Sequence, residues 1–162
     1  MKKYLVLCAA FLLVSGCSRP LRPAEKEEAR RASLELQSVM EMVNSRSIPP
    51  VDFELGSATL KASSFALLDK VADVLMKHHT LKLIVEGHTD DTGSAGFNEE
   101  MSLKRAGAVK AYLARKGVYP DSVRVYGYGS RRPLLKGDSD EDRSVNRRVE
   151  FRITTRDWAS VF

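Results

Sequence analysis

Residues 86–113 read EGHTDDTGSAGFNEEMSLKRAGAVKAYL and join a strand-like run to a helix-like one. The preceding residues place Leu81, Leu83 and Val85 in one alternating phase, which predicts a β-strand. Three glycines and several short polar side chains then predict a loop, and Asn98 is a plausible N-cap for a helix that ends near Lys116–Gly117. A charged loop between the carboxyl end of a strand and a helix is a common place for ligands in α/β units.

Further periodic runs complete one domain over about residues 48–154. The predicted strands and helices follow the order β-α-β-α-β-β, which is an α+β sandwich with two main helices packed on a mixed four-stranded sheet. Besides the elements above, we expect a strand at 51–55, a helix from Ser63 or Ser64 to His79, a strand from Val123 into YGYG, and a strand at 147–153. In the helix that ends at His79, four apolar residues are expected to face inward: Leu68, Val71, Val74 and Leu75.

The first residues are typical of an export signal. Lys2 and Lys3 precede an apolar run, residues 4–14, that is shorter than the roughly 20 residues needed to cross a bilayer. Residues 14–17 (VSGC) resemble the lipobox of bacterial lipoproteins, in which the cysteine is acylated after cleavage before it. We therefore expect a signal peptide over residues 1–16 and lipid on Cys17. The resemblance, with Ser18 next, favours the outer membrane, with the domain facing the periplasm. An ordinary signal peptide with an incidental Cys17 is the alternative.

Residues 17–47 are predicted to form a lipidated tether and a spacer helix. From Ala24 to Asn44, apolar residues recur at steps of three and four, and Ile48-Pro49-Pro50 ends the helix. A spacer that packs on its own domain is favoured over a short dimeric coiled coil, so a monomer is the expected state.

Charge and cysteine content exclude some functions. Loss of the two lysines in residues 1–16 lowers the net charge from +5 to +3, too small an excess to indicate nucleic-acid binding. Cys8 leaves with the signal and Cys17 carries lipid, so no disulfide or CxxC metal site is expected.

Two opposite charges are predicted to face one cavity. Asp90 lies at the tip of a strand, and Arg105 lies on the following helix at the margin of an apolar stripe that includes Met101. A partly desolvated guanidinium there needs a carboxylate. Arg147 shares the phase of Val149 in the last predicted strand. We therefore expect it to point inward and to brace the Thr89–Asp90 loop.

The motif constellation resembles the peptidoglycan-binding domain of OmpA-like proteins and Pal-type lipoproteins. It consists of residues 86–113, YGYGSRRP at 126–133 and NRRVEF at 146–151. The resemblance implies a pocket for the diaminopimelate of the peptidoglycan stem peptide, with Asp90 on its ammonium group and Arg105 on its carboxylate. It also implies that Thr89, Asn98, Met101, Phe53 and Glu54 line this pocket.

The sequence therefore predicts a non-enzymatic tether between outer membrane and cell wall, without cofactor, metal or catalytic residues. An adaptor of a secretion or motility complex, with envelope protein partners and residues 24–44 as docking helix, is one alternative. A wall hydrolase using Glu86 and Asp90 near His88 is the other. His88 is expected to be structural and bonded to backbone, and residues 138–143 to be a solvated connection. Residues 155–162 form a tail for which the sequence predicts no role.

Overall fold

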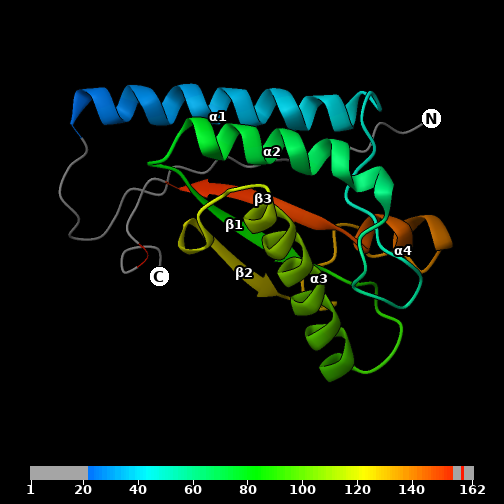
Figure 1. Ribbon diagram of the computed structural model, residues 1–162. Helices are drawn as coiled ribbons and strands as arrows, with labels where there is room; N and C mark the ends of the chain where they lie inside the picture. Colours follow the sequence, from blue (N-terminus) through cyan, green and yellow to red (C-terminus); the bar gives the residue numbers. More distant parts are fainter. Residues whose placement is uncertain (1–21, 155–157, 159–162) are drawn as a thin grey trace.

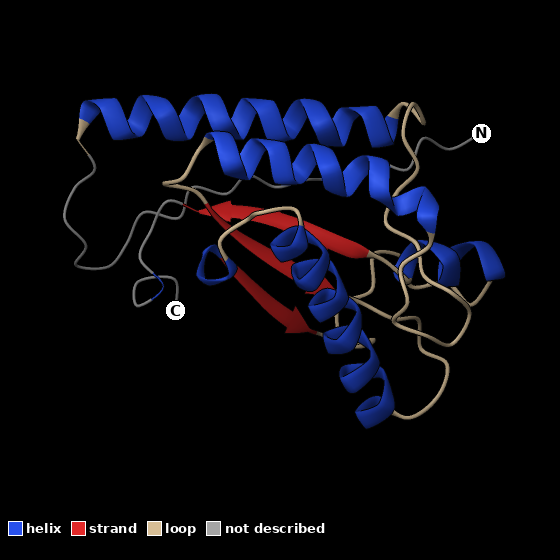
Figure 2. Ribbon diagram, in the orientation of Figure 1, coloured by secondary structure: helices blue, strands red, loops and turns tan. Residues whose placement is uncertain are grey.

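The computed structural model describes residues 22–154 and Trp158, and the fold is a mixed sheet with helices packed in successive layers (Figure 1). The signal peptide, Cys17 and most of the C-terminal tail lie outside these residues. Strand β1 (Lys82–Gly87) is central, with β2 (Val123–Gly127) parallel on one side and β3 (Val149–Thr154) antiparallel on the other. Figure 2 shows long loops gathered at the end of the sheet where β1 and β2 finish.

The predicted α+β class is confirmed, but the sheet of the described residues has three strands rather than four. Residues 51–55 form only an isolated antiparallel bridge, between Phe53 and Leu60. The segment folds back on itself, because the Glu54 N–H donates to the Thr59 carbonyl at 2.9 Å and the Lys61 N–H to the Asp52 carbonyl at 3.0 Å. This local hairpin satisfies backbone groups within the segment itself, outside the sheet of β2, β1 and β3.

The helices pack one on another. Helix α3 (Ala95–Arg115) lies on β1 and β2, α2 (Phe65–Lys77) packs beside α3, and α1 (Pro23–Asn44) packs on α2. The inward residues expected for α2 are all buried. Of the helices in the described part of the chain, none has the length and apolar character needed to span a membrane.

Helix α1 belongs to the domain and does not stand apart from it. Its side chains Ala32, Leu36, Val39 and Met40 are buried in the same core as α2 and the sheet. Its apolar stripe is therefore occupied within the chain, as the favoured spacer interpretation requires, and is not available for a coiled coil.

Two glycines allow α3 to approach the sheet closely. A Cβ on Gly87 would lie 2.1 Å from the Ser102 carbonyl oxygen, and one on Gly127 would lie 2.5 Å from the Leu103 nitrogen. The structure thus gives Gly87, one of the three glycines that predicted a loop, a packing role at the end of β1.

Two helix starts differ from the prediction. Helix α3 begins one turn earlier than expected, because the Ser94 hydroxyl accepts the Phe97 N–H at 3.2 Å and caps the helix in place of Asn98. Residues 138–143 are solvated at 138–141, as expected, but from Asp140 onward they belong to helix α4 (Asp140–Asn146) and are not only a connection. Ser139 caps α4 by accepting the Asp142 N–H at 3.1 Å, and three acidic residues occupy its first turn, where the helix dipole favours them.

Candidate ligand-binding site

The loop between β1 and α3 is held from both sides. The Thr89 N–H donates to the Gly129 carbonyl at 3.0 Å. The Asn98 side-chain amide donates to the carbonyls of Asp90 at 3.3 Å and Thr92 at 2.9 Å. Asn98 therefore fixes the loop from within the first turn of α3, and the loop fixes the direction of the Asp90 side chain.

Asp90 is a buried carboxylate with partners on both oxygens. Its Oδ1 accepts from the Thr92 N–H at 3.1 Å and from the Thr92 hydroxyl, and its Oδ2 accepts from Arg147 Nη1 at 2.7 Å. Burial alone would raise the pKa of Asp90, but the hydrogen bonds from Thr92 and Arg147 outweigh it and lower the pKa below its usual value. Asp90 is therefore a fixed negative charge at neutral pH.

Arg105 is a half-buried cation held by the hairpin of residues 53–60. Its Nε donates to the Ser57 carbonyl at 3.0 Å, and its guanidinium lies over the Phe53 ring, 5.2 Å from the centroid. Burial and the positive charge of Arg147 lower the pKa of Arg105, while the carboxylate of Asp90 raises it. The remaining guanidinium nitrogens stay available for a ligand carboxylate.

Asp90 and Arg105 line one cavity of about 610 Å³. This volume lies within the usual range of small-molecule sites, about 300–1,000 Å³. All the residues that the sequence placed in the pocket border it: Phe53, Glu54, Thr89, Asp90, Asn98, Met101 and Arg105. Arg147, which was expected to brace the loop, borders it as well. The lining contains charges of both signs, which suits a ligand that also carries both.

Arg147 reaches Asp90 by a different route from the one predicted. It follows α4 and precedes β3, so it has no position in the strand, and its side chain is 46% exposed. The expectation that it points into the buried phase of the last strand is therefore wrong, although it does contact a carboxylate of the loop.

Sequence reasoning missed part of the lining. Leu55, Lys61, Phe97 and Arg143 also border the cavity. The apolar spacing of residues 51–60 does not indicate that Leu55 borders a cavity, because residues at the tip of a turn follow neither a helical nor a strand period. Phe97 could have been found from the Ser94 cap, which places it in the first turn of α3.

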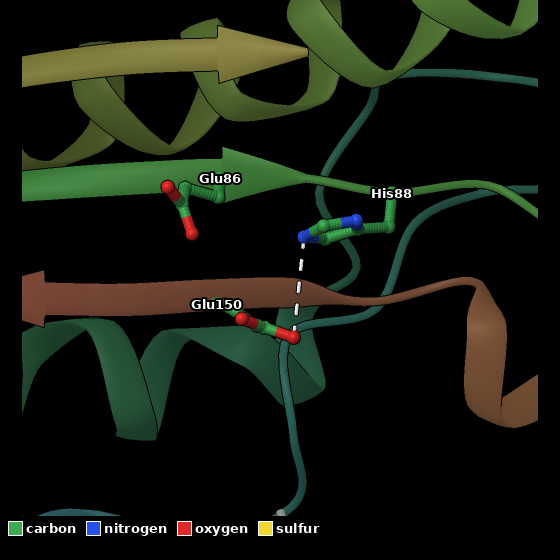
Figure 3. Close-up of side chains that lie close together, drawn as sticks. All are labelled: Glu86, His88 and Glu150. Atoms are coloured by element: carbon green, nitrogen blue, oxygen red, sulfur yellow. Dashed lines mark ion pairs between the residues drawn. The ribbon is translucent and has the colours of Figure 1, made fainter. Parts of the chain in front are cut away.

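A second polar cluster lies on the sheet behind the loop (Figure 3). Glu86 and Glu150 are opposite each other on β1 and β3, and His88 points toward them, with one ligand atom of each residue within 4.8 Å of the others. Each carboxylate already has a cation, because Arg152 Nη2 lies 2.8 Å from Glu86 and Arg148 Nη2 lies 2.6 Å from Glu150. These pairs neutralise the charge that would attract a metal ion.

His88 is structural in a different way from the one predicted. Its main-chain N–H donates to the Arg148 carbonyl at 2.9 Å, but its two buried ring nitrogens have no hydrogen-bond partner among the described residues. The ring stacks on Tyr128, with 5.5 Å between centroids. Burial, helped by the charge of Arg148, lowers the pKa of His88 to about 4. The expected bond to backbone is therefore made by the main chain of His88 and not by its ring, and the imidazole is neutral at pH 7.

The same geometry disfavours hydrolysis. Glu86 is 3% exposed, is paired with Arg152 and does not border the cavity. The pKa of Asp90 is lowered, so this carboxyl does not carry a proton to donate at neutral pH. The hydrolase alternative requires an acid and a base in one cavity. Glu86 and Asp90 do not meet this requirement.

Comparison with known proteins identifies the family. The model of the OmpA family matches residues 52–147, which is more than half of the chain. The chain belongs to the OmpA family. The matched region contains the cavity-lining hairpin, the β1–α3 loop and α3.

Relatives of this OmpA-family chain include outer-envelope proteins. It is 35% identical over 115 residues to a peptidoglycan-associated lipoprotein of Pseudomonas putida, covering 71% of this chain and 69% of the relative. It is 34% identical over 103 residues to outer membrane porin F of Pseudomonas fluorescens, covering 64% of this chain and 32% of the porin. The chain thus spans only about a third of the porin's length.

A solved structure agrees with the fold. The peptidoglycan-associated lipoprotein from Burkholderia pseudomallei superposes with a TM-score of 0.62 at 27% identity, covering 64% of this chain and 88% of that one. The Pal resemblance seen in the sequence is confirmed by this structure and by the lipoprotein relative. Membership of this family also supports the prediction that the chain is not an enzyme.

Proposed function

We propose that this chain binds peptidoglycan non-covalently through the diaminopimelate of the stem peptide and tethers the outer membrane to the cell wall. The observation that carries the proposal is that the fixed anion Asp90 and the half-buried cation Arg105 line one cavity. The similarity to a peptidoglycan-associated lipoprotein of P. putida, which covers 71% of this chain, supports binding to peptidoglycan.

In the proposed complex the charged tip of diaminopimelate spans the two groups. Its ammonium group binds Asp90, and its carboxylate binds Arg105, which can donate two parallel hydrogen bonds. Met101, Thr89, Asn98 and the Phe53–Glu54 pair line the space between them. Arg147 holds Asp90 in place at 2.7 Å.

A sacculus pull-down with matched variants tests the site. Asp90→Asn and Arg105→Gln are each expected to lower the affinity for sacculi, measured by co-sedimentation, by at least about 100-fold. Each change leaves a charged partner in the cavity unpaired. Asp91→Asn and Arg115→Gln alter an adjacent acid and an arginine of the same helix, neither of which lines the cavity, and should bind normally.

The outcomes separate loss of the site from misfolding and from hydrolysis. Circular dichroism must show that the Asp90 and Arg105 variants remain folded. Undiminished pull-down by either folded variant refutes the two-charge site. Release of soluble wall fragments by the wild type would establish hydrolysis instead.

Ligand preference provides an independent test of the chemistry. A lysine side chain has the ammonium group but lacks the adjacent carboxylate, so Arg105 gains nothing from it. We expect stem peptides with diaminopimelate to bind at least about tenfold more tightly than stem peptides with lysine, measured by calorimetry. Equal affinities would show that the site reads only one charge.

The membrane side of the proposal rests on the sequence. Lipid on Cys17 would hold the protein in the outer membrane, since two or more acyl chains anchor a protein stably. Cys17→Ser is expected to move the protein from the membrane fraction to the soluble periplasm while sacculus binding persists. Retention of the variant in the membrane fraction contradicts lipid anchoring at Cys17.

The adaptor alternative receives less support. Its proposed docking helix, α1, uses its apolar stripe for packing against α2 and the core. A partner would therefore meet the outer face of α1, which is mostly charged and polar apart from the exposed Leu34 and Met42, a weaker basis for stable docking.

A further inference from the structure

Leu55 stands fully exposed at the tip of a turn beside the cavity. The Ser57 N–H donates to the Glu54 carbonyl at 3.1 Å, and Gly56 has a φ of +61°, so residues 54–57 form a tight turn. Such tips usually carry glycine, proline, asparagine, aspartate or serine. The Leu55 side chain is 102% exposed and does not pack in the core, yet it borders the cavity.

The turn is fixed to the cation of the site. Arg105 donates to the Ser57 carbonyl at 3.0 Å and lies over the Phe53 ring on the same hairpin. The bridge between Phe53 and Leu60 closes the hairpin behind the turn. The turn that carries Leu55 is therefore held in place by Arg105, and both residues border the cavity.

Phe97 brings a second exposed apolar side chain to the same cavity from a different element. It lies in the first turn of α3, where its N–H is held by the Ser94 hydroxyl, and it is 56% exposed. Leu103 and Leu134 are also exposed, at 45% and 44%, but neither borders the cavity. Two exposed apolar residues from separate elements thus meet around one charged pocket, which is a pattern typical of a binding surface.

We propose that Leu55 and Phe97 form an apolar rim that contacts the methyl and methylene groups of the residues flanking diaminopimelate in the stem peptide. The inference rests on the proposed function, in which the charged tip occupies the space between Asp90 and Arg105. The charged groups then select the tip, and the rim adds affinity for a peptide longer than one residue. The physical basis is the removal of exposed apolar surface from water on both partners.

The test compares two ligands of different length. The full-length protein is titrated by calorimetry with free diaminopimelate and with the tetrapeptide L-Ala-γ-D-Glu-diaminopimelate-D-Ala. Leu55→Ser and Phe97→Ser are each expected to weaken tetrapeptide binding about fivefold and to leave free diaminopimelate within about twofold. Leu134→Ser and Leu103→Ser, exposed on another loop and on the same helix, should change neither affinity.

Each outcome decides a different point. Unchanged tetrapeptide binding in both rim variants overturns the rim, and so does an equal loss for both ligands, which would mean that the residues shape the charged pocket instead. Failure of the wild type to bind either ligand refutes the proposed function itself. Because Leu55 is fully exposed, its substitution is not expected to affect folding, and thermal melting of each variant checks this.

Discussion

Acidification from pH 7.5 to 5 is expected to lower the free energy of unfolding by about 2 kcal/mol through His88 alone. Burial and the charge of Arg148 hold the pKa of His88 at about 4 in the folded protein, against an ordinary value of 6.5. The unfolded chain takes up a proton below about pH 6.5 and the folded chain only below about pH 4. Unfolding therefore binds protons in this window, and stability falls as the pH falls. The complete effect amounts to about 3 kcal/mol, because one pH unit corresponds to about 1.4 kcal/mol.

Urea unfolding at several pH values between 7.5 and 5 measures this effect. Paired carboxylates such as Asp90, whose pKa is lowered, also cost stability in acid, so the wild-type curve alone is not specific. His88→Phe removes the titrating ring and both unpaired nitrogens, while an aromatic ring can still stack on Tyr128. The difference between wild type and this variant isolates His88. His79→Gln, at an exposed position, should keep the wild-type dependence.

The sign of the result tests the arrangement in Figure 3. His88 Nε2 lies 3.9 Å from Glu150, and the groups facing the ring also include Glu86, Arg148 and Tyr128. If the imidazole were charged and paired with Glu150, its pKa would be raised and acid would increase its contribution to stability. A pH dependence that is the same in wild type and His88→Phe, or reversed, refutes the buried neutral ring.

The remaining predictions concern the site and the core. Arg147→Gln is expected to weaken diaminopimelate binding about tenfold in calorimetry, because Asp90 loses its cation at 2.7 Å; tighter binding would mean that Arg147 competes with the ligand. Gly87→Ala should lower the free energy of unfolding by about 3 kcal/mol or more, since its Cβ would overlap α3. Gly107→Ala, mid-helix with open space around it, should raise that free energy by about 0.5–1 kcal/mol, and equal effects of the two changes would refute the close approach. Leu36→Ala should cost about 2–4 kcal/mol in urea unfolding, and no cost would show that α1 lies outside the core.

Periodicity predicted those elements whose side chains face a single core. The helix of residues 65–77 and the strand of residues 82–87 lie close to their expected positions, because burial imposes their spacing. Residues 51–55 read as a strand by composition, but the turn at Gly56 closes a local hairpin before a sheet partner is met. Helix α4 was missed because it is short and largely solvated, so only its serine cap and acidic first turn indicate it.

The site was predictable where chain geometry alone determines it. Asp90 follows a central strand and Arg105 lies three turns into the next helix, so local structure directs both side chains toward one space. The contact of Arg147 depends on where α4 ends, which the sequence did not reveal. Leu55 depends on a turn whose position follows from tertiary packing against Arg105.

The ion pair between Asp90 and Arg147 bears on which ligands can enter the cavity. A ligand with only an ammonium group would have to displace or share a guanidinium that already donates to Asp90 at 2.7 Å, and it would offer Arg147 no anion in return. Under the proposed function, a ligand with a carboxylate beside its ammonium group brings that anion into the cavity, which Arg147 and Arg105 both line. Asp90 is thus paired with Arg147 before binding, and Arg105, which has no carboxylate partner among the described residues, gains one on binding. On the proposed function, we therefore expect the internal pair to disfavour singly charged amines relative to a zwitterion, so that specificity depends on Arg147 as well as on Asp90 and Arg105.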